Sequence, residues 1–211
     1  MIQIRDVLQV KFGSIDQAVE LFTNPAIPAP AMTVTGHHFE VLTDITGKMY
    51  ALVNEYAAQD LGEYETIRSQ QFAAPEFDKW FKQFQLFVEG GQREFYNVEG
   101  AYESWSGPGL VVVRESYRAY KWQIRTAVAL LERYGGLLVD RGVGQKPRIL
   151  TDASGHMFNA IIEIETESMS TWESQRRLLF RQVEFRVWFN QMLTAVESGS
   201  HEFYRVEYIH D

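Results

Sequence analysis

A stretch of sixteen residues occurs twice in this chain, and no other feature constrains the fold as strongly. The first copy, Val41–Tyr56, reads VLTDITGKMYALVNEY, and the second, Ile149–Ile164, reads ILTDASGHMFNAIIEI. Around these copies, residues 41–100 and residues 149–208 share 22 identities in 60 positions without a gap. Self-similarity on this scale indicates two copies of one structural unit.

The similarity extends back to the N-terminus after a shift of one position, where Ile4-Arg5 aligns with Val113-Arg114. We therefore expect repeat one at residues 1–99, a linker at 100–109 and repeat two at 110–211. The linker ends in SGPG, a composition typical of turns. Each repeat has about 100 residues, which is enough for a small core of its own.

Hydrophobic periodicity and turn residues predict the order β-α-β-β-α-β in each repeat. Three prolines in Asn24–Ala31 predict an extended loop, and Pro75 predicts a break in the second helix of repeat one. Gly90-Gly91 predicts the end of that helix. The expected strands are 2–11, 33–42, 48–57, 94–99, 110–119, 137–151, 156–165 and 201–208, and the expected helices are 14–22, 61–88, 122–134 and 168–197.

A β-α-β-β-α-β unit is ferredoxin-like, with helices on one face of an antiparallel sheet and the other face left open. Two open faces within one chain can close on each other. The expected fold class is therefore α+β, with two ferredoxin-like repeats whose antiparallel sheets pair into a barrel inside a single chain.

The turn glycine, the short strand ending in Glu and the acidic, aromatic start of the next helix resemble the dimeric α/β-barrel superfamily. Within it they resemble the NIPSNAP-like proteins, as a tandem duplication that covers nearly the whole chain. This superfamily hosts haem-degrading monooxygenases, small-quinol monooxygenases, isomerases and members without known activity, so fold alone does not choose the function. The residues that carry the resemblance are Gly47, Asn54-Glu55 and Leu61–Glu65 in repeat one, and Gly155, Glu163 and Met169–Glu173 in repeat two.

Composition and motifs exclude several classes of protein. The formal net charge is −8 and no basic run exceeds Arg176-Arg177, so we expect no nucleic-acid partner. The chain has no cysteine, which excludes disulfides and thiolate chemistry. Without a signal-peptide pattern or an apolar run of membrane-spanning length, we expect a cytoplasmic protein with no membrane partner. We find no metal-ligand spacing and no Gly-rich phosphate loop, and so expect no metal and no cofactor.

Alternation along the strands predicts which side chains face the space between the two sheets. One face of the strand around Phe158–Ile164 is fully apolar and suits the helix side, so its other face should point inward. Ile4 and Val113 suit the helix side of the first strands in the same way. The predicted inward-facing residues are Arg5, Gln9, Met49, Glu55, Arg114, Ser116, Arg118, Asn159 and Glu163.

An Arg and a Glu that recur in both repeats allow two interpretations. In the first, Arg5 or Arg114 binds an anionic ligand and Glu55 or Glu163 acts as a base or acceptor. In the second, the same residues form a belt of salt bridges that specifies how the two halves pair. For the first interpretation, the ligand-binding candidates are Arg5, Arg114, Arg118, Asn159 and Met49.

His37 and His38 are further catalytic candidates. They are adjacent on a predicted strand, so only one of them can face the interior, as a general base or an axial haem ligand. Repeat two has Gln145-Lys146 at these positions, which favours a surface or structural role. The resemblance implies an Asn, a Trp and a His in fixed positions for haem degradation, and not all three can be placed, since Asn54 should face the helices. Trp80 and its counterpart in repeat two should pack in the core.

Three classes of function remain. The first is an uncharacterised protein that binds a small hydrophobic or aromatic ligand between the sheets, consistent with 14% aromatic residues. The second is a cofactor-independent monooxygenase or isomerase for an aromatic or polyketide-like substrate. In that case His37 or His38, with Glu55 or Glu163, would move protons beneath the loop Pro25–Pro30. The third is a structural module that forms homo-oligomers through its sheet edges.

Overall fold

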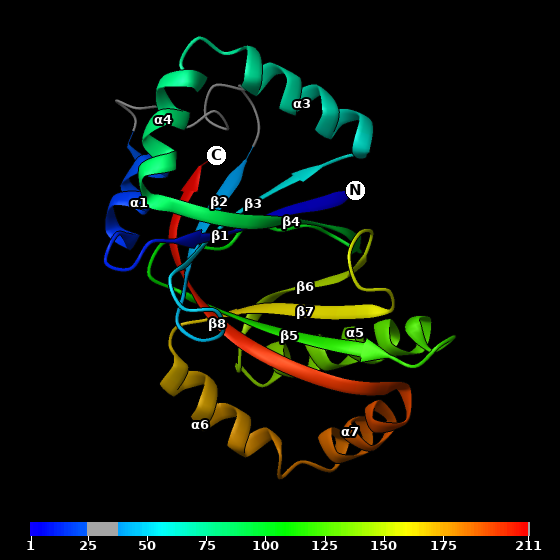
Figure 1. Cartoon of the computed structure of the whole chain (residues 1–211). Coiled ribbons are helices and arrows are strands. Elements are labelled where there is room, and N and C mark those ends of the chain that lie inside the picture. The colour runs from blue at the N-terminus through cyan, green and yellow to red at the C-terminus, as the bar shows by residue number, and fades with distance from the viewer. Residues whose placement is uncertain (25–37, 211) are drawn as a thin grey trace.

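The structure, a computed structural model, describes residues 1–24 and 38–210 (Figure 1). These residues form an α+β fold with eight strands and six helices. Repeat one contains β1 (Ile2–Val10), α1 (Ile15–Thr23), β2 (Phe39–Asp44), β3 (Ala51–Ala58), α3 (Leu61–Ala73), α4 (Phe77–Phe87) and β4 (Val88–Glu99). Repeat two contains β5 (Val111–Ala119), α5 (Ile124–Asp140), β6 (Gln145–Asp152), β7 (Asn159–Thr166), α6 (Met169–Leu179), α7 (Val183–Ala195) and β8 (Val196–His210).

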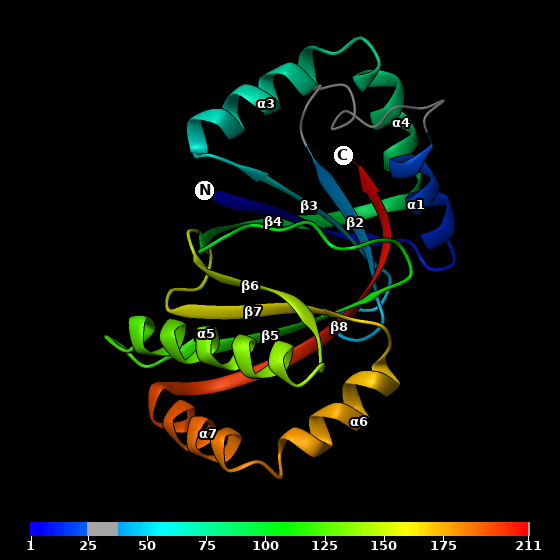
Figure 2. The same ribbon diagram turned by 180° about the vertical axis from the view of Figure 1, so that it is seen from behind.

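The strands form a closed antiparallel barrel in the order β1-β3-β2-β8-β5-β7-β6-β4. Helices α1, α3 and α4 cover the outside of the barrel at one side, and α5, α6 and α7 cover the opposite side (Figure 1, Figure 2). The α+β class and the closing of the sheets into a barrel are thereby confirmed. Among the described residues, no helix is both long enough and apolar enough to cross a membrane.

The sequence that occurs twice forms the β2–β3 hairpin of repeat one and the β6–β7 hairpin of repeat two. In each hairpin the turn aspartate accepts a hydrogen bond from the first residue of the following strand. Ala51 N lies 2.7 Å from Asp44 Oδ1, and Asn159 N lies 2.8 Å from Asp152 Oδ1. The shared TD-x-x-G sequence is therefore explained by a shared turn geometry.

Each hairpin tip also holds the last strand of the other repeat. Phe203 N donates to Thr46 Oγ1 at 3.0 Å, and Phe95 N donates to Ser154 Oγ at 2.9 Å. The two sheets are joined through β2–β8 and β4–β6, which are equivalent strand pairs. The repeats are thus arranged as two matched halves, each of which completes the barrel of the other.

Helix α5 is longer than the sequence predicts. It runs to Asp140, into the region 137–151 that was predicted as strand. Leu131, Tyr134 and Leu138 extend a buried helical face with spacings of three and four residues, and this face outweighs the two glycines between them.

The predicted boundaries of the second helix in each repeat also differ from the structure. Gly90-Gly91 does not end a helix, because α4 already ends at Phe87 and both glycines belong to β4. Gly91 allows strands to approach closely, since a Cβ there would lie 2.8 Å from the Val7 carbonyl oxygen. The predicted helix at 168–197 is divided into α6 and α7 although it contains no proline. The break between α6 and α7 therefore forms without a proline.

The first helices of the two repeats differ in length. Helix α1 has 9 residues, whereas α5 has 17. The two helices are equivalent up to Phe22 in α1 and Leu131 in α5, and both of these residues are buried. Helix α1 then ends two residues before Pro25, as expected for a chain about to enter a proline. The proline loop beyond Asn24, together with residues 33–37 of the predicted strand, lies outside the described residues.

Candidate functional site

The barrel interior contains the two ion pairs whose residues the repeat predicts. Arg5 pairs with Glu55, and Arg114 pairs with Glu163, with side chains at most 4% exposed. Each guanidinium also lies over a tyrosine ring of the other repeat. The Arg5 Cζ is 4.7 Å from the Tyr204 ring centroid, and the Arg114 Cζ is 4.9 Å from that of Tyr96. These arginine–tyrosine contacts join one repeat to the other. Such contacts are expected if the buried charges form a belt that specifies how the two repeats pair.

A third buried pair, between Glu40 and Arg148, was missed by sequence reasoning. Its nitrogen–oxygen distances are 2.6 and 2.8 Å, and both side chains are fully buried. The two residues occupy equivalent positions, 108 apart, in the two repeats. A search for residues that the repeats share overlooks them because they differ. Opposite charges at equivalent inward positions were the signal that could have revealed the pair.

The segment at 100–109 packs onto this third pair rather than forming a free tether. Trp105 N donates to Glu40 Oε1 at 2.8 Å, and the Arg148 Cζ lies 3.6 Å from a Trp105 ring centroid. Ser106 donates twice to Glu165, from N and Oγ, at 2.7 and 2.6 Å. Charged pairs and an apolar cluster lie between the sheets. That cluster consists of Leu42, Val53, Trp105, Val112, Tyr204 and Val206.

Burial and neighbouring charge shift the pKa of two interior carboxyls in opposite directions. Burial and the nearby Glu163 raise the pKa of Glu55 to about 7, although Arg5 opposes the shift. Burial alone would raise the pKa of Glu40, but hydrogen bonds from His38 and Arg148 lower it below its usual value. Glu40 is therefore held as the ionised partner of its arginine.

The histidine candidates are only partly described. His37 lies outside the described residues. The His38 Nε2 lies 3.2 Å from Glu40 Oε1, and its side chain is 22% exposed. His38 thus contacts a residue of the third ion pair at its edge.

Three ligand-binding candidates lie toward the ends of the barrel. The predicted inward position of Met49 is wrong, because β3 begins only at Ala51 and Met49 is 68% exposed in the turn before it. Arg118 is 46% exposed and lies 3.4 Å from Glu197. Asn159 is the first residue of β7 and half-buried. The ligand-binding roles of these residues, and of Arg5 and Arg114, stay predictions.

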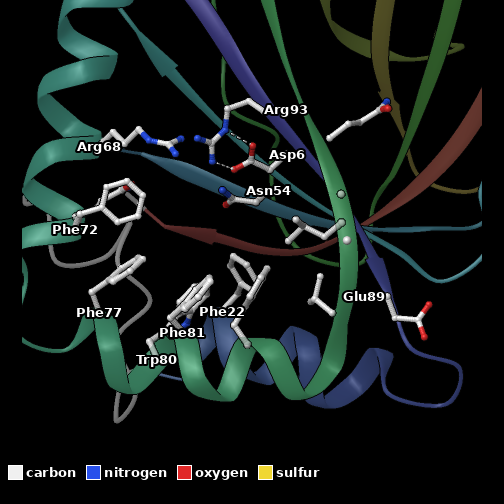
Figure 3. A pocket seen from close by; sticks show the side chains of 17 residues that line it. Asp6, Phe22, Asn54, Arg68, Phe72, Phe77, Trp80, Phe81, Glu89 and Arg93 are labelled. Carbon is white, nitrogen blue, oxygen red and sulfur yellow. Dashed lines mark hydrogen bonds and ion pairs between the residues drawn. The ribbon is translucent and has the colours of Figure 1, made fainter.

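A cavity of about 540 Å³ lies on the other face of the repeat-one sheet, beneath α3 and α4 (Figure 3). Its volume falls in the range of small-molecule sites. Its apolar wall carries aromatic rings from three helices, and its floor is formed by β1, β3 and β4. The aromatic residues of the wall are Phe22, Phe72, Phe77, Trp80, Phe81 and Phe84.

The polar side of this cavity is a connected group of charges. Arg93 binds both carboxylate oxygens of Asp6 at 2.5 and 2.7 Å. The Tyr64 hydroxyl accepts hydrogen bonds from Arg93 at 2.6 Å and from Arg68 at 2.8 Å. Burial tends to lower the pKa of Arg93, but the bond to Asp6 outweighs burial and raises it. Two guanidinium groups therefore stand, charged, along one edge of an aromatic pocket.

Asn54 points into the cavity beside this charged group (Figure 3). It is only 5% exposed, and its Oδ1 has no hydrogen-bond partner. A buried amide oxygen without a partner is costly in a folded protein, so a donor from outside the chain would stabilise Asn54 in this position. The alternation along β3 places Asn54 opposite the inward-facing Glu55, so sequence reasoning put it on the helix side but assigned it no role there.

The same region of repeat two is closed. Tyr134 of α5 stacks on Trp188, with ring centroids 4.1 Å apart, and its hydroxyl donates to Glu115 Oε1 at 3.2 Å. Tyr117 donates to the other oxygen of Glu115 at 2.5 Å. Glu115 is the equivalent of Asp6, so here the carboxylate is bound by phenols of its own repeat. Ile162 replaces the asparagine and removes the free amide.

No protein-family model matches the sequence, and neither does any curated protein. A crystal structure from Fusobacterium nucleatum subsp. nucleatum, provisionally assigned as a monooxygenase, is similar at a TM-score of 0.71 and 10% identity, over 100% of this chain and 94% of that chain. The structure of an anthrone oxidase-like protein is similar at a TM-score of 0.71 and 13% identity, over 99% and 92%. A NIPSNAP domain protein from Burkholderia xenovorans matches 50% of this chain over 100% of its own, with a TM-score of 0.42 and 14% identity.

The full-length likenesses confirm the resemblance to dimeric α/β-barrel proteins at the level of the fold. NIPSNAP-domain proteins are also among the similar structures, each matching about half of this chain. At these identities the likeness extends to the fold alone. The chemistry has to be argued from the cavity of repeat one.

Proposed function

We propose that repeat one is a cofactor-independent monooxygenase site for a planar, hydroxylated aromatic substrate. The observation that carries the proposal is the amide oxygen of Asn54, buried without a partner in an aromatic cavity. A hydroxyl group on a ring compound would supply the missing donor. The provisional assignment of one structural neighbour as a monooxygenase, and the anthrone oxidase-like nature of another, are in keeping with this class of reaction.

The walls of the cavity suit fused rings. Trp80 and Phe84 are stacked with their centroids 4.9 Å apart, and Phe77 and Phe81 are stacked at 5.5 Å. These parallel faces offer flat apolar contact to a polycyclic substrate. The guanidinium of Arg68 at the polar edge would stabilise negative charge that develops on a ring oxygen. Rings on one side and cations on the other favour a phenolic aromatic over an aliphatic ligand.

The reaction can proceed with the substrate as its own reductant. A methylene between two aromatic rings loses a proton, for which Asp6 is the nearby carboxylate, and leaves a delocalised carbanion. Transfer of electrons from this carbanion to O₂ forms a C–O bond, and loss of water then yields the ketone. The balance is R₂CH₂ + O₂ → R₂C=O + H₂O, with four electrons supplied by the substrate. The roles of the chain are to bind the rings, accept the proton and stabilise the anion.

The proposal moves the ligand from the space between the sheets to the helix side of one sheet. Trp105 and three ion pairs lie between the sheets, which favours the helix-side cavity as the ligand site. Glu55 and Glu163 then serve as partners for arginines, and their predicted role in moving protons stays untested.

Oxygen uptake with 2-hydroxyanthrone, in protein supplied with neither haem nor metal, tests this function. We expect turnover above the uncatalysed oxidation, and a loss on the order of 100-fold in Asn54→Ile, which installs the residue of repeat two. Lys79→Val also installs a repeat-two residue, but at an exposed position of α4, and should keep full activity. Equal rates with and without protein, or an Asn54→Ile variant as active as the wild type, would overturn the proposal.

A further inference from the structure

Repeat two has a cavity of its own, of about 560 Å³, between α6 and β8. Three of its lining positions are equivalent to positions in the repeat-one cavity. It lies closer to the start of α6 because Tyr134 fills the inner space. Its walls combine rings with cationic or titratable side chains, namely Trp172, Phe180, Phe203, Arg176, Arg177 and His201.

Arg176 distinguishes this cavity from its counterpart. In repeat one the equivalent Arg68 donates to the Tyr64 hydroxyl at 2.8 Å. Repeat two has Trp172 in place of that tyrosine, so the oxygen is missing. The buried Nε of Arg176 has no hydrogen-bond partner, although the guanidinium also contacts the Tyr134 hydroxyl. Part of the hydrogen-bonding capacity of Arg176 is therefore not used by the protein.

The guanidinium of Arg176 is bordered by aromatic rings. Its Cζ lies 4.7 Å from the Phe180 ring centroid and 5.9 Å from that of Trp172. Trp172 is 3% exposed and gives the cavity a rigid floor, whereas Phe180 is 41% exposed and borders its mouth. A flat ring that enters the cavity would meet aromatic surface before it reaches the cation.

The charges that line the cavity favour an anion in spite of the net charge of −8. Arg177 is matched by Glu173, at 2.6 Å. Arg176 forms no ion pair with a carboxylate that lines the cavity, and the buried Glu115 behind it is linked to it only through the Tyr134 hydroxyl. A carboxylate is the partner that a guanidinium binds most specifically, through paired hydrogen bonds.

We propose that the α6–β8 cavity of repeat two is a second binding site, specific for an aromatic carboxylate. The ring of the ligand packs between Trp172 and Phe180, and its carboxylate binds Arg176. No residue of the repeat-one cavity takes part, so this site stands whether or not repeat one oxidises 2-hydroxyanthrone.

Titration of isotopically labelled protein with 2-naphthoate, followed by NMR of the backbone amides, tests the proposal. We expect saturable shifts at residues 169–177 and 201–203. Arg176→Gln should weaken this binding at least tenfold, and the uncharged analogue 2-naphthamide should bind the wild-type protein at least tenfold more weakly. Arg181→Gln removes an exposed arginine beyond the end of α6 and should leave the affinity unchanged.

A second variant covers the case in which Arg176→Gln does not fold. Ser170→Trp fills the cavity from the first turn of α6 without altering Arg176, and should abolish the same shifts. The proposal is overturned by 2-naphthoate shifts confined to repeat one, by no shifts at all, or by equal affinity for 2-naphthoate and 2-naphthamide. Unchanged affinity in a folded Arg176→Gln variant would overturn it as well.

Discussion

The two repeats have the same strand order and the same buried tryptophan, yet in repeat one a cavity opens onto that tryptophan, whereas the cavity described for repeat two lies elsewhere, between α6 and β8. Trp80 donates to Leu21 O at 3.1 Å, and Trp188 donates to the equivalent Leu130 O at 2.7 Å, so the frameworks match closely. What differs is the side chain that meets the tryptophan. Tyr134 covers Trp188, whereas Trp80 borders an open cavity.

Helix length, rather than the strand framework, therefore decides whether the space beside the buried tryptophan is open or filled. The extra turns of α5 carry Tyr134 and Leu138 onto the sheet. Helix α1 ends before any equivalent turn forms. The duplicated framework thus keeps a cavity beside the tryptophan in repeat one, whereas the cavity of repeat two lies toward the start of α6. The following predictions test this difference between the repeats, in order of decreasing effect.

Loss of one member of the central ion pair should have the largest effect on stability. Glu40→Gln removes the closer carboxylate of the buried Arg148 and leaves it only Glu55, at 3.7 Å, so we expect the free energy of unfolding to fall by about 3 kcal/mol. Urea denaturation measures the loss. Because the two positions are equivalent in the two repeats, exchanging the residues (Glu40→Arg with Arg148→Glu) should recover part of it. An exchange variant no more stable than Glu40→Gln would show that the two sites are not interchangeable.

Removing the side chain that closes repeat two should have an effect nearly as large. Tyr134→Ala leaves a cavity against Trp188 and takes a donor from Glu115, so we expect a loss of about 3 kcal/mol in unfolding free energy. The variant should also gain affinity for 2-hydroxyanthrone in repeat two, measured as quenching of tryptophan fluorescence. Phe22→Ala in repeat one, by contrast, enlarges a cavity that is already open. If Tyr134→Ala gains no affinity, helix length is not what closes repeat two.

The raised pKa of Glu55 predicts how stability depends on pH. The pKa is about 7 in the folded protein against 4.5 in the unfolded chain, so protonation favours folding. This contribution is complete below pH 4.5, is lost as pH rises to 7, and is worth up to about 3 kcal/mol. Glu55→Gln mimics the protonated acid. Its unfolding free energy should therefore rise relative to the wild type between pH 4.5 and 8.

The control for this pH effect is Glu173→Gln, which changes an exposed carboxylate and should show no such trend. A Glu55→Gln variant that instead loses stability relative to the wild type as pH rises would mean that Glu55 is an ordinary ionised partner of Arg5. Its pairing would then resemble that of Glu40, whose pKa is lowered.

The smallest predicted effect concerns helix caps that the repeats share. Asp60 Oδ1 accepts from Glu63 N at 2.9 Å, and Ser168 Oγ accepts from Thr171 N at 3.0 Å. Asp60→Ala and Ser168→Ala should each lower the unfolding free energy by about 1 kcal/mol, measured by thermal denaturation. Clearly unequal losses would indicate that the frameworks differ beyond the α1–α5 pair.

The repeat makes much of this fold accessible from sequence. Shared residues such as Arg5 and Arg114, or Asp44 and Asp152, occupy shared positions, and alternation along strands tells their direction. The Glu40–Arg148 pair escapes the same reasoning because the two residues differ in type and meet only when the barrel closes. A contact between opposite charges 108 positions apart has no local signal.

The candidate site was harder to predict for a different reason. The sequence pattern predicts that Trp80 is a core residue, and its exposed fraction of 7% agrees with that interpretation. Its ring nevertheless also borders the cavity. Periodicity tells which side of a helix is apolar but not whether the facing element fills the space. That depends on where α1 ends, and therefore on Pro25. The orphaned oxygen of Asn54 becomes visible only once every neighbour is placed.

A crystal structure of the protein soaked with 2-hydroxyanthrone in the absence of oxygen would locate the substrate in one of the two candidate spaces. We expect ring density beneath α4, stacked along Trp80 and Phe84, with a ring oxygen within hydrogen-bonding distance of the polar edge at Asn54 or Arg68. Density between the two sheets, next to Glu55 and Glu163, would contradict this expectation.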